Sequence, residues 1–284
     1  MKWRNRRVSS NIEDRRGTGS RGGGKKKIGG IAAIIITLAS MYFGIDPKIV
    51  LGLLGATGIG TTTTQQAPYQ PSPEQQQLAN FTGVVLADTE DTWNTIFQKE
   101  GRRYQEPKLV LFTNTVRSAC GHAEASMGPF YCPGDHQVYI DLGFFKQLKT
   151  QHNAPGDFAQ AYVIAHEVGH HVQNLLGIST KVSQLQQRAS KAEANQLSVR
   201  LELQADCFAG LWANHTEKAK HILEQGDVEE ALNAASQIGD DRLQKQARGY
   251  ASPESFTHGS SEQRVHWFKK GLTEGTLKAC NTFG

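Results

Sequence analysis

Three features that mark other protein classes are missing from this sequence of 284 residues. Its four cysteines include no Cys-x-x-Cys pair, which argues against a zinc ribbon. It has no internal repeat, which excludes a stacked-repeat architecture. No clear Ala-x-Ala site follows its one long apolar run, which argues against a cleaved signal peptide. The length fits one domain with appendages, or two small domains.

Acidic residues are scarce at the N-terminus. Residues 1–27 contain ten Lys and Arg and two acids, whereas the whole chain has a net charge of +4, so the remainder is net acidic. We predict that residues 1–27 form a disordered basic arm. A Gly- and Arg-rich arm is also typical of nucleic-acid binding, but the segment that follows it favours a membrane function, and we predict no nucleic-acid partner.

Residues 28–45 carry no charge and are largely apolar, at the short end of what spans a bilayer. The basic run 25–27 precedes them, and positive charge stays cytoplasmic. We therefore predict a single-pass, uncleaved signal-anchor in the cytoplasmic (inner) membrane, with the N-terminus in the cytoplasm and the folded domain on the periplasmic side. The alternative is a cleaved signal peptide, whose basic region would be unusually long.

Two further regions follow the predicted transmembrane helix. Residues 46–76 contain a short, Gly-rich apolar patch and then a polar stretch with three prolines, so we predict a membrane-proximal segment and linker. Residues 77–284 form the folded domain. Its apolar runs predict strands at 108–112 and 137–141 and, elsewhere, several long helices. The predicted class is α+β, helix-dominated, with a small sheet.

The most informative stretch is His-Glu-Val-Gly-His at residues 166–170. On a helix, positions i and i+4 lie on one face, so His166 and His170 can bind one Zn²⁺, and Glu167 can reach a water on that metal. Two histidines on a solvated helix face are the alternative interpretation. The surrounding segment is largely apolar, however, and burying these side chains without a metal or partner is costly.

A second pair of residues supplies the rest of a metal site. Glu202 and Asp206 are also four residues apart, within a segment crowded by Leu, Ala, Phe and Trp. We predict Glu202 as the third zinc ligand, and Asp206 as the acceptor of a hydrogen bond from the free ring nitrogen of His166 or His170. An exposed acidic pair is the alternative, but the apolar neighbours indicate a buried helix.

The combination of H-E-x-x-H and E-x-x-A-D resembles the gluzincin branch of zinc metallopeptidases. Other motifs narrow the resemblance, and together they resemble the bacterial membrane-anchored family of putative neutral zinc metallopeptidases: Tyr131-Cys132-Pro133-Gly134-Asp135, Val138-Tyr139-Ile140-Asp141, and Ser255-Phe256-Thr257-His258-Gly259 with Arg264. The resemblance covers nearly the whole chain. It implies a zincin-like domain with one Zn²⁺ per chain, which hydrolyses a peptide or protein substrate.

The resemblance also implies roles for residues that do not bind the metal. Glu167 would act as general base toward a zinc-activated water. His258 would donate to the oxyanion, as in other gluzincin membrane proteases, although Gly259 replaces the proline of that motif. Tyr139 and Arg264 are further candidates for substrate binding. The strand at 137–141 would be the sheet edge that pairs with an extended substrate, or else an ordinary core strand.

The four cysteines are consistent with disulfides in an oxidising compartment. Cys120 and Cys132 flank a short Gly/Pro-rich loop, so we expect them to pair, which leaves Cys207 with Cys280. Sequence alone does not select among the three possible connectivities.

Two other functions are compatible with these motifs. One is a zinc hydrolase of a non-peptide amide. The other is a catalytically silent, membrane-anchored scaffold that uses zinc structurally. The intact Glu167 argues against the scaffold, because a structural zinc site needs no base and normally closes with four protein ligands.

Overall fold

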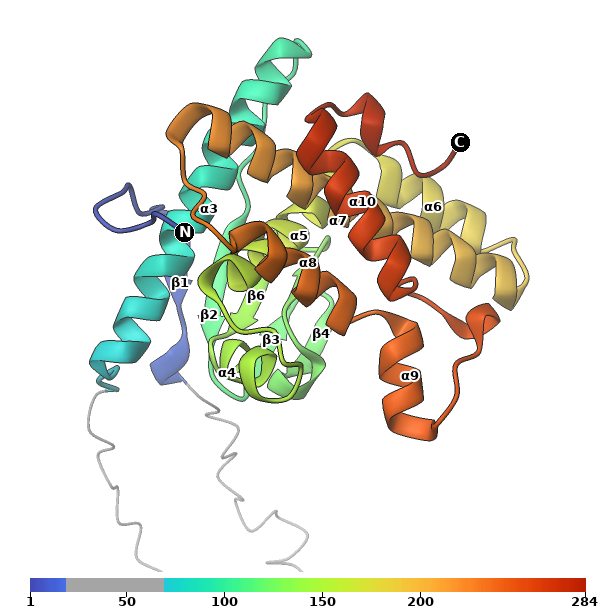
Figure 1. Cartoon of the computed structure of the whole chain (residues 1–284), viewed down its shortest axis with the longest axis horizontal. Helices are drawn as coiled ribbons and strands as arrows, with labels where there is room; N and C mark the ends of the chain where they lie inside the picture. Colours follow the sequence, from blue (N-terminus) through green and yellow to red (C-terminus); the bar gives the residue numbers. More distant parts are fainter. Residues whose placement is uncertain (19–68) are drawn as a thin grey trace, which may run out of the picture. The chain divides into compact units, whose positions relative to one another are not determined.

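The computed structural model describes residues 1–18 and 69–284, and the residues before and after the gap belong to one folded unit (Figure 1). The strands are β1 (Ile12–Asp14), β2 (Lys108–Phe112), β3 (Thr115–Ser118), β4 (Gly121–Glu124), β5 (Phe130–Cys132) and β6 (Gln137–Asp141). Four of them form a sheet in the order β1-β2-β6-β5, and β3 and β4 form a separate hairpin. Strands β1, β2 and β6 are parallel, whereas β5 runs antiparallel to β6. Both predicted strands, at 108–112 and 137–141, are confirmed.

Helices make up most of the described chain. The α-helices are α3 (Pro73–Lys99), α4 (Gly143–Thr150), α5 (Asp157–Leu175), α6 (Ile178–Gln186), α7 (Lys191–Lys220), α8 (Asp227–Gln237), α9 (Asp240–Arg248) and α10 (Ser261–Glu274). Short 3-10 helices occur at η1 (Arg16–Thr18), η2 (Ala125–Met127), η3 (Pro253–Ser255) and η4 (Lys278–Cys280). The helix-rich α+β class with a small sheet is therefore confirmed.

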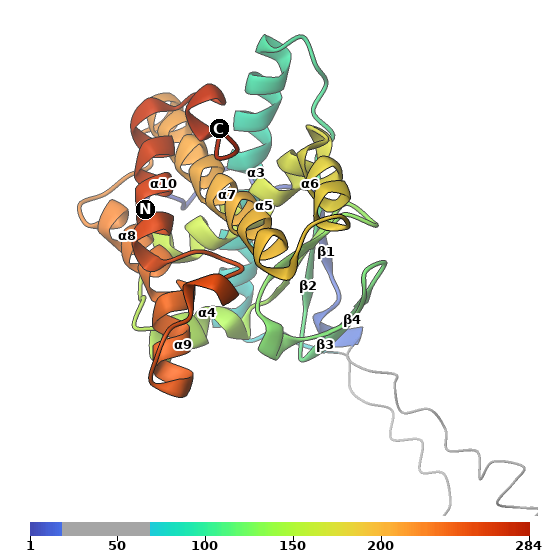
Figure 2. The same cartoon turned by 90° about the vertical axis from the view of Figure 1, so that its right-hand side faces the viewer.

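Helix α5 lies at the centre of the domain. It packs against α7, α8 and α3 and against the sheet through β5 and β6. Figure 2 shows the strands on one side, α8 and α10 on the other, and α5 and α7 between them. Fourteen of its nineteen residues are buried, because α5 contacts other elements on most of its sides. The position of α5 is thus determined by packing on several sides.

Two disulfides join distant parts of this fold. Cys120 is bonded to Cys132, which ties the β3–β4 hairpin to β5, and Cys207 is bonded to Cys280, which ties the C-terminal segment to α7. This is the pairing expected from the loop around Cys120. Each bond restricts the unfolded chain and so favours the folded state.

The N-terminal residues differ from the predicted disordered arm. Residues 1–18 are folded: Ile12, Glu13 and Asp14 of β1 pair in parallel with β2. Basic side chains of this segment are bonded to α3, with Arg6 to Asp88 at 2.5 Å and Arg7 to Glu90 at 2.9 Å. Charge complementarity with α3 therefore accounts for two of the basic residues of this segment, Arg6 and Arg7.

The predicted single-pass membrane topology is wrong. Residues 28–45 lie outside the described residues, and no helix within 1–18 and 69–284 is long and apolar enough to cross a bilayer. Moreover, β1 and β2 belong to one sheet. A single crossing between them would place them on opposite sides of the membrane. The predicted single-pass signal-anchor, which places the N-terminus and the folded domain on opposite sides of the inner membrane, is therefore corrected.

Candidate metal centre

Helices α5 and α7 bring the two predicted motifs together. His166 and His170 lie one turn apart on α5, and Glu202 faces them from α7. Close approach of these helices depends on Gly169, since a Cβ there would lie 3.1 Å from the backbone oxygen of Ala205. Glycine in the H-E-x-x-H motif therefore allows the carboxylate of α7 to reach the histidines of α5.

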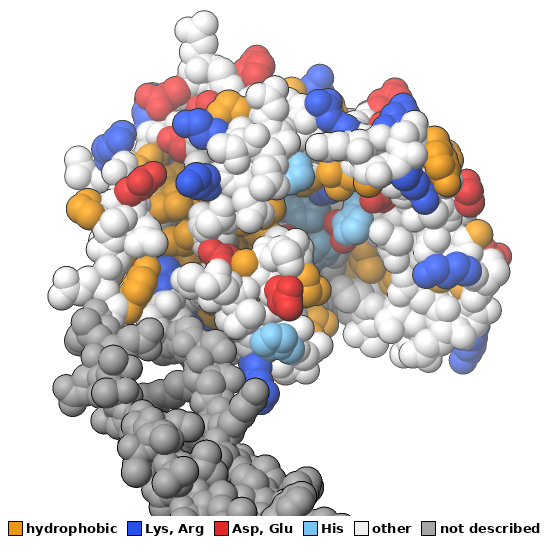
Figure 3. Space-filling model, turned by 90° about the horizontal axis from the view of Figure 1, so that it is seen from below, with side chains coloured by type: hydrophobic (Ala, Val, Ile, Leu, Met, Phe, Trp, Pro, Cys, Tyr) orange, Lys and Arg blue, Asp and Glu red, His pale blue; other side chains and the backbone are white. Residues whose placement is uncertain are grey.

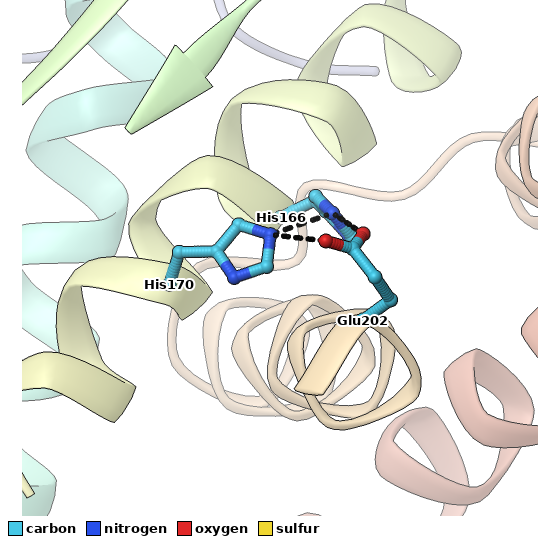
Figure 4. Close-up of side chains that lie close together, drawn as sticks. All are labelled: His166, His170 and Glu202. Carbon is cyan, nitrogen blue, oxygen red and sulfur yellow. Dashed lines mark hydrogen bonds and ion pairs between the residues drawn. The ribbon is translucent and has the colours of Figure 1, made fainter. Parts of the chain in front are cut away.

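Three ligand groups, two imidazoles and one carboxylate, converge at this point (Figure 4). The Nε2 atoms of His166 and His170 are 3.2 Å apart. Glu202 Oε2 lies 3.2 Å from Nε2 of His166, and its Oε1 lies 3.4 Å from Nε2 of His170. A tetrahedral zinc site with bonds of about 2.0–2.1 Å has ligand–ligand edges of roughly 3.3–3.4 Å. The separations between the two imidazole nitrogens, and between each nitrogen and the carboxylate oxygen nearest to it, therefore fit a zinc site.

Hydrogen bonds on the far side of each ring orient the two imidazoles. His166 Nδ1 lies 2.8 Å from Asp206 Oδ1, and His170 Nδ1 lies 2.9 Å from Gln173 Oε1. Both partners are acceptors, since Gln173 uses its Nε2 to donate to the carbonyl of Leu201. Each Nδ1 therefore donates its proton to its partner, and the Nε2 atoms of both rings are directed at the carboxylate of Glu202, where they can bind a cation. Three acceptors that converge in this way call for a cation.

Asp206 takes the supporting position expected from the sequence. Its carboxylate is fully buried and accepts from His166, from Tyr162 Oη at 2.5 Å and from Arg264 Nε at 2.9 Å. Burial opposes its ionisation, but Arg264 and His166 outweigh that cost and lower the pKa of Asp206. The ionised carboxylate thus holds the ring of His166 in place.

Arg264, predicted from the sequence as a substrate-binding residue, lines the same cavity as the ligands, and its guanidinium is bonded to Asp206 and Tyr162. Its side chain is 2% exposed and donates from Nε and Nη2 to Asp206, and from Nη2 also to Tyr162. Its guanidinium is therefore part of the support behind the metal ligands. A buried arginine in this position is stabilised because the carboxylate accepts two of its N–H groups.

Without a metal, the site retains protons. Burial alone would lower the pKa of His166, but the nearby Asp206 and Glu202 carboxylates raise it from 6.5 to about 10. Burial likewise opposes ionisation of Glu202, yet the two histidines hold its pKa well below its usual range. The site therefore favours positive charge at the point where the three donors meet.

Glu167 lies in a cavity beside the three candidate metal ligands. It lines a cavity of about 650 Å³ together with His166, His170 and Glu202. In Figure 3, histidine side chains lie in the hollow that opens between two parts of this surface. Glu167 is 8% exposed, and it is not one of the three candidate ligands, His166, His170 and Glu202. A carboxylate in this position can act as a base toward a water in the cavity.

His258 lines the same cavity, as the sequence predicts for an oxyanion donor. The residue that holds it, Asp240, was missed. Asp240 Oδ2 accepts from the backbone N–H groups of Thr257 and His258 at 2.7 and 2.6 Å, and its Oδ1 lies 3.3 Å from His258 Nδ1. The hydrogen bond to Asp240 raises the pKa of His258 above 6.5. No local pattern links residues 240 and 258, which explains why Asp240 was not found.

Tyr139 and the strand that carries it do not reach the cavity. Tyr139 is 1% exposed and donates its hydroxyl to Asp135 at 2.7 Å, while its ring stacks on Phe130. Strand β6 is paired with β2 along its whole length and with β5 at residues 137–139, so it is an internal strand of the sheet. The edge strand beside the cavity is β5, whose residues Phe130 and Tyr131 line it.

Two other residues of α5, His171 and Gln173, lie close to the second histidine of the H-E-x-x-H motif and have different roles. His171, which follows the second ligand, points away: it is fully buried and its Nε2 lies 2.6 Å from the carbonyl oxygen of Gln105. Burial lowers its pKa to about 4, so it is neutral. Gln173, which orients His170, was missed. It lies three residues beyond that ligand, and helical periodicity was the available signal.

Comparisons with known proteins agree with this geometry. A family model described as "Putative neutral zinc metallopeptidase" matches residues 1–283. The uncharacterized protein YpfJ of Escherichia coli K12 is 52% identical over 291 residues, covering all of this chain and 99% of that protein. The uncharacterized protein Rv2575 of Mycobacterium tuberculosis H37Rv is 44% identical over 190 residues, which are 63% of each chain. No solved structure matches.

Proposed function

The chain belongs to the putative neutral zinc metallopeptidase family, and we propose that it is a zinc-dependent endopeptidase. One observation carries the proposal: the acceptor atoms of His166, His170 and Glu202 converge beside a free carboxylate, Glu167, in an open cavity. Three ligands leave one position for water or substrate, as catalytic zinc sites require, whereas structural sites use four protein ligands.

The chain's own residues would divide the work of peptide hydrolysis. A zinc ion held by His166, His170 and Glu202 would supply a Lewis acid that acidifies water and polarises the scissile carbonyl. Glu167 would take the proton of the attacking water and then pass it to the nitrogen of the leaving amine. Asp206 and Gln173 would hold the two imidazoles in the tautomer that binds metal.

His258 would stabilise the negative charge that develops on the carbonyl oxygen. It lines the cavity from the loop before α10, and its bond to Asp240 favours the protonated ring. A charged donor that is already in place lowers the barrier, because no reorganisation is needed when charge develops.

Strand β5 is the best support for the substrate backbone. It is an edge strand of the sheet, and it borders the cavity beside the metal ligands. An extended peptide can add to such an edge through main-chain hydrogen bonds, which are independent of the substrate sequence. This assignment replaces the internal strand β6.

The test is Glu167→Gln in the full-length protein. The amide keeps the shape of the side chain but cannot act as a base, so the variant is expected to fold and to bind one zinc. Its cleavage of a peptide library should fall by roughly 10²–10⁴-fold, as is typical when general acid–base catalysis is lost. His166→Ala should lose both zinc and activity.

Chelation and zinc add-back complete the experiment. Cleavage by the parent that stops with a chelator, returns with zinc and is lost in Glu167→Gln supports a zinc peptidase. Undiminished cleavage by Glu167→Gln would contradict the proposed base. A parent that binds zinc but cleaves no peptide would contradict the peptidase assignment and favour a non-peptide hydrolase or a silent scaffold.

A further inference from the structure

Each residue of strand β5 is attached to a different part of the domain. The ring of Phe130 stacks on Tyr139 of the neighbouring strand, and Cys132 is bonded to Cys120 of the β3–β4 hairpin. Tyr131 points to the opposite face, because side chains alternate along a strand, and it packs against the core that contains α5. Tyr131 therefore faces the helix that carries the metal ligands.

A chain of hydrogen bonds fixes the hydroxyl of Tyr131 on α5. His171 Nε2 lies 2.6 Å from the carbonyl oxygen of Gln105, which can only accept, so this nitrogen carries the proton of the neutral ring. His171 Nδ1 is then an acceptor, and Tyr131 Oη donates to it at 3.1 Å. Asn174 Nδ2 donates to the same Oη at 3.1 Å. The hydroxyl thus donates once to α5 and accepts once from it.

These two bonds join β5 to α5 next to the metal ligands. His171 and Asn174 are three residues apart and share one face of α5, which is turned by about 100° from the ligand His170. In the described part of the chain, the hydrogen bonds between β5 and α5 are those of Tyr131. Tyr131 also lines the catalytic cavity together with His170. Its two bonds therefore set how far the edge strand lies from the ligands.

Main-chain pairing alone holds β5 weakly. The strand has three residues and pairs with β6. Most strands in globular proteins are about 5–6 residues long, so this ladder is short. Pro129 and Pro133 flank the strand, and proline has no N–H group that could extend the pairing. The distance between β5 and the metal ligands consequently depends on side-chain contacts.

We propose that His171 and Asn174 are positioning residues for peptide hydrolysis, because through Tyr131 they hold edge strand β5 at a fixed distance from the metal ligands. This inference rests on the proposed peptidase function and on the role of β5 in it. A peptide that pairs with β5 presents its scissile carbonyl to the metal only when strand and ligands are correctly spaced. A displacement of about 1 Å can lower the rate by about 10²-fold.

Zinc-directed probes test this positioning without catalysis. Acetohydroxamate binds the metal alone, whereas a tripeptide hydroxamate binds the metal and can also pair with β5. Each probe is titrated into the zinc-loaded, full-length protein by calorimetry, and the ratio of the two affinities reports how well strand and metal are aligned. We expect Tyr131→Phe to lower this ratio by at least about fivefold, the equivalent of one net hydrogen bond. Affinity for zinc and for acetohydroxamate should stay as in the parent.

Tyr104→Phe is the matched control. Tyr104 is buried, and its ring also packs on His171, with centroids 5.8 Å apart. Its hydroxyl has no hydrogen-bond partner among the described residues, and Tyr104 is not one of the described residues that line the cavity. The same atom is removed beside the same histidine, so the affinity ratio should not change.

Asn174→Ala provides a second, milder variant. Asn174 is half-buried, and its removal leaves the bond between Tyr131 and His171 in place. We therefore expect a smaller fall of the affinity ratio in the same direction. This variant carries the test if Tyr131→Phe does not fold.

The outcomes separate positioning from a merely structural role. Parent-like ratios in Tyr131→Phe and Asn174→Ala, with only the melting temperature lowered, would overturn the inference. It would also be overturned by a parent that binds the tripeptide probe no more tightly than acetohydroxamate, because β5 would then not hold the peptide.

The same measurements distinguish this inference from the proposed function. A lowered ratio in Tyr131→Phe, in a protein that cleaves no peptide, would support the link between strand and metal and contradict the peptidase. Chelator-sensitive cleavage with an unchanged ratio would leave the peptidase standing and overturn the positioning role.

Discussion

Asp206 is the residue on which the metal site depends most after the ligands themselves. It is fully buried, and its two oxygens accept from His166, Tyr162 and Arg264. A buried carboxylate is stable only when its hydrogen-bonding capacity is satisfied. Its ionised form fixes the tautomer of His166, so the effect of Asp206 on zinc is indirect and comes through that ring.

Zinc content should distinguish Glu202 from Asp206. Glu202→Ala removes a ligand and a negative charge, and we expect a purified variant to lose stoichiometric zinc. Asp206→Asn changes only the partner of His166, and we expect affinity to fall by about 10–100-fold. Glu229→Ala, at an exposed position of α8, is the control. Full zinc occupancy in Glu202→Ala, measured by metal analysis, would show that another residue is the third ligand.

The pair of Asp240 and His258 predicts a pH dependence. The hydrogen bond to Asp240 raises the pKa of His258, so the protonated donor is present below that pKa and is lost as pH rises through it. Asp240→Asn removes the charge but keeps an acceptor for the backbone N–H groups. We expect the alkaline limb of the rate profile to move to lower pH, with the acid limb unchanged.

His258→Gln is the matching control for that profile. It removes the titrating ring, so the contribution of His258 to the alkaline limb should disappear and activity at its optimum should fall. A profile of Asp240→Asn that coincides with that of the parent would contradict the assignment of His258 as a protonated donor.

At the scale of elements, the crossing of α7 and α10 determines where Arg264 lies. Gly210 of α7 would place a Cβ against the backbone of Phe268, and Gly271 of α10 would place one against the backbone of Cys207. Only glycine permits such close contact between two helices. The close crossing brings Arg264 to Asp206, so packing of these helices supports the metal ligands.

Gly271→Ala tests the crossing. The added methyl group overlaps backbone atoms, which cannot rotate aside, so the helices must separate. We expect the free energy of unfolding to fall by about 1–3 kcal/mol or more, and zinc affinity to fall with it. Thr273→Ala, on the exposed side of α10, should change stability by less than about 0.5 kcal/mol. Chemical denaturation measures both; parent-like stability of Gly271→Ala would refute the close crossing.

At the scale of the whole molecule, the first residues of the chain complete the sheet. Strand β1 covers the edge of β2, and Arg6 and Arg7 bond to acidic residues of α3. The backbone groups of β2 that pair with β1 would otherwise be unpaired. The sheet is therefore assembled from residues on both sides of the segment 19–68.

A fragment of residues 69–284 should consequently be less stable than the full chain. Loss of β1 and of its ion pairs is expected to cost at least about 2 kcal/mol, which lowers the melting temperature by roughly 5 °C or more for a domain of this size. A synthetic peptide of residues 1–18 should restore part of the difference, whereas a scrambled peptide should not. Equal melting temperatures of fragment and full chain would show that β1 is dispensable.

Sequence alone was sufficient to predict features that lie within a single helix or strand. His166, Glu167 and His170, and likewise Glu202 and Asp206, are related by the turn of one helix, so their spacing determines their common face. The strands at 108–112 and 137–141 were recognisable because a buried strand must be apolar along its length.

Tertiary structure decided every feature that depends on distant partners. Basic residues near the N-terminus were read as a solvated arm because the acids that pair with them, on α3, lie some 80 positions away. For the same reason, sequence did not show that Arg264 donates to Asp206 or that Asp240 bonds to His258. The prediction that the strand at 137–141 is an edge strand was wrong because β5 pairs with it, and β5 is the edge strand. Charge and polarity show that a side chain needs a partner, but only the fold determines which partner lies within reach.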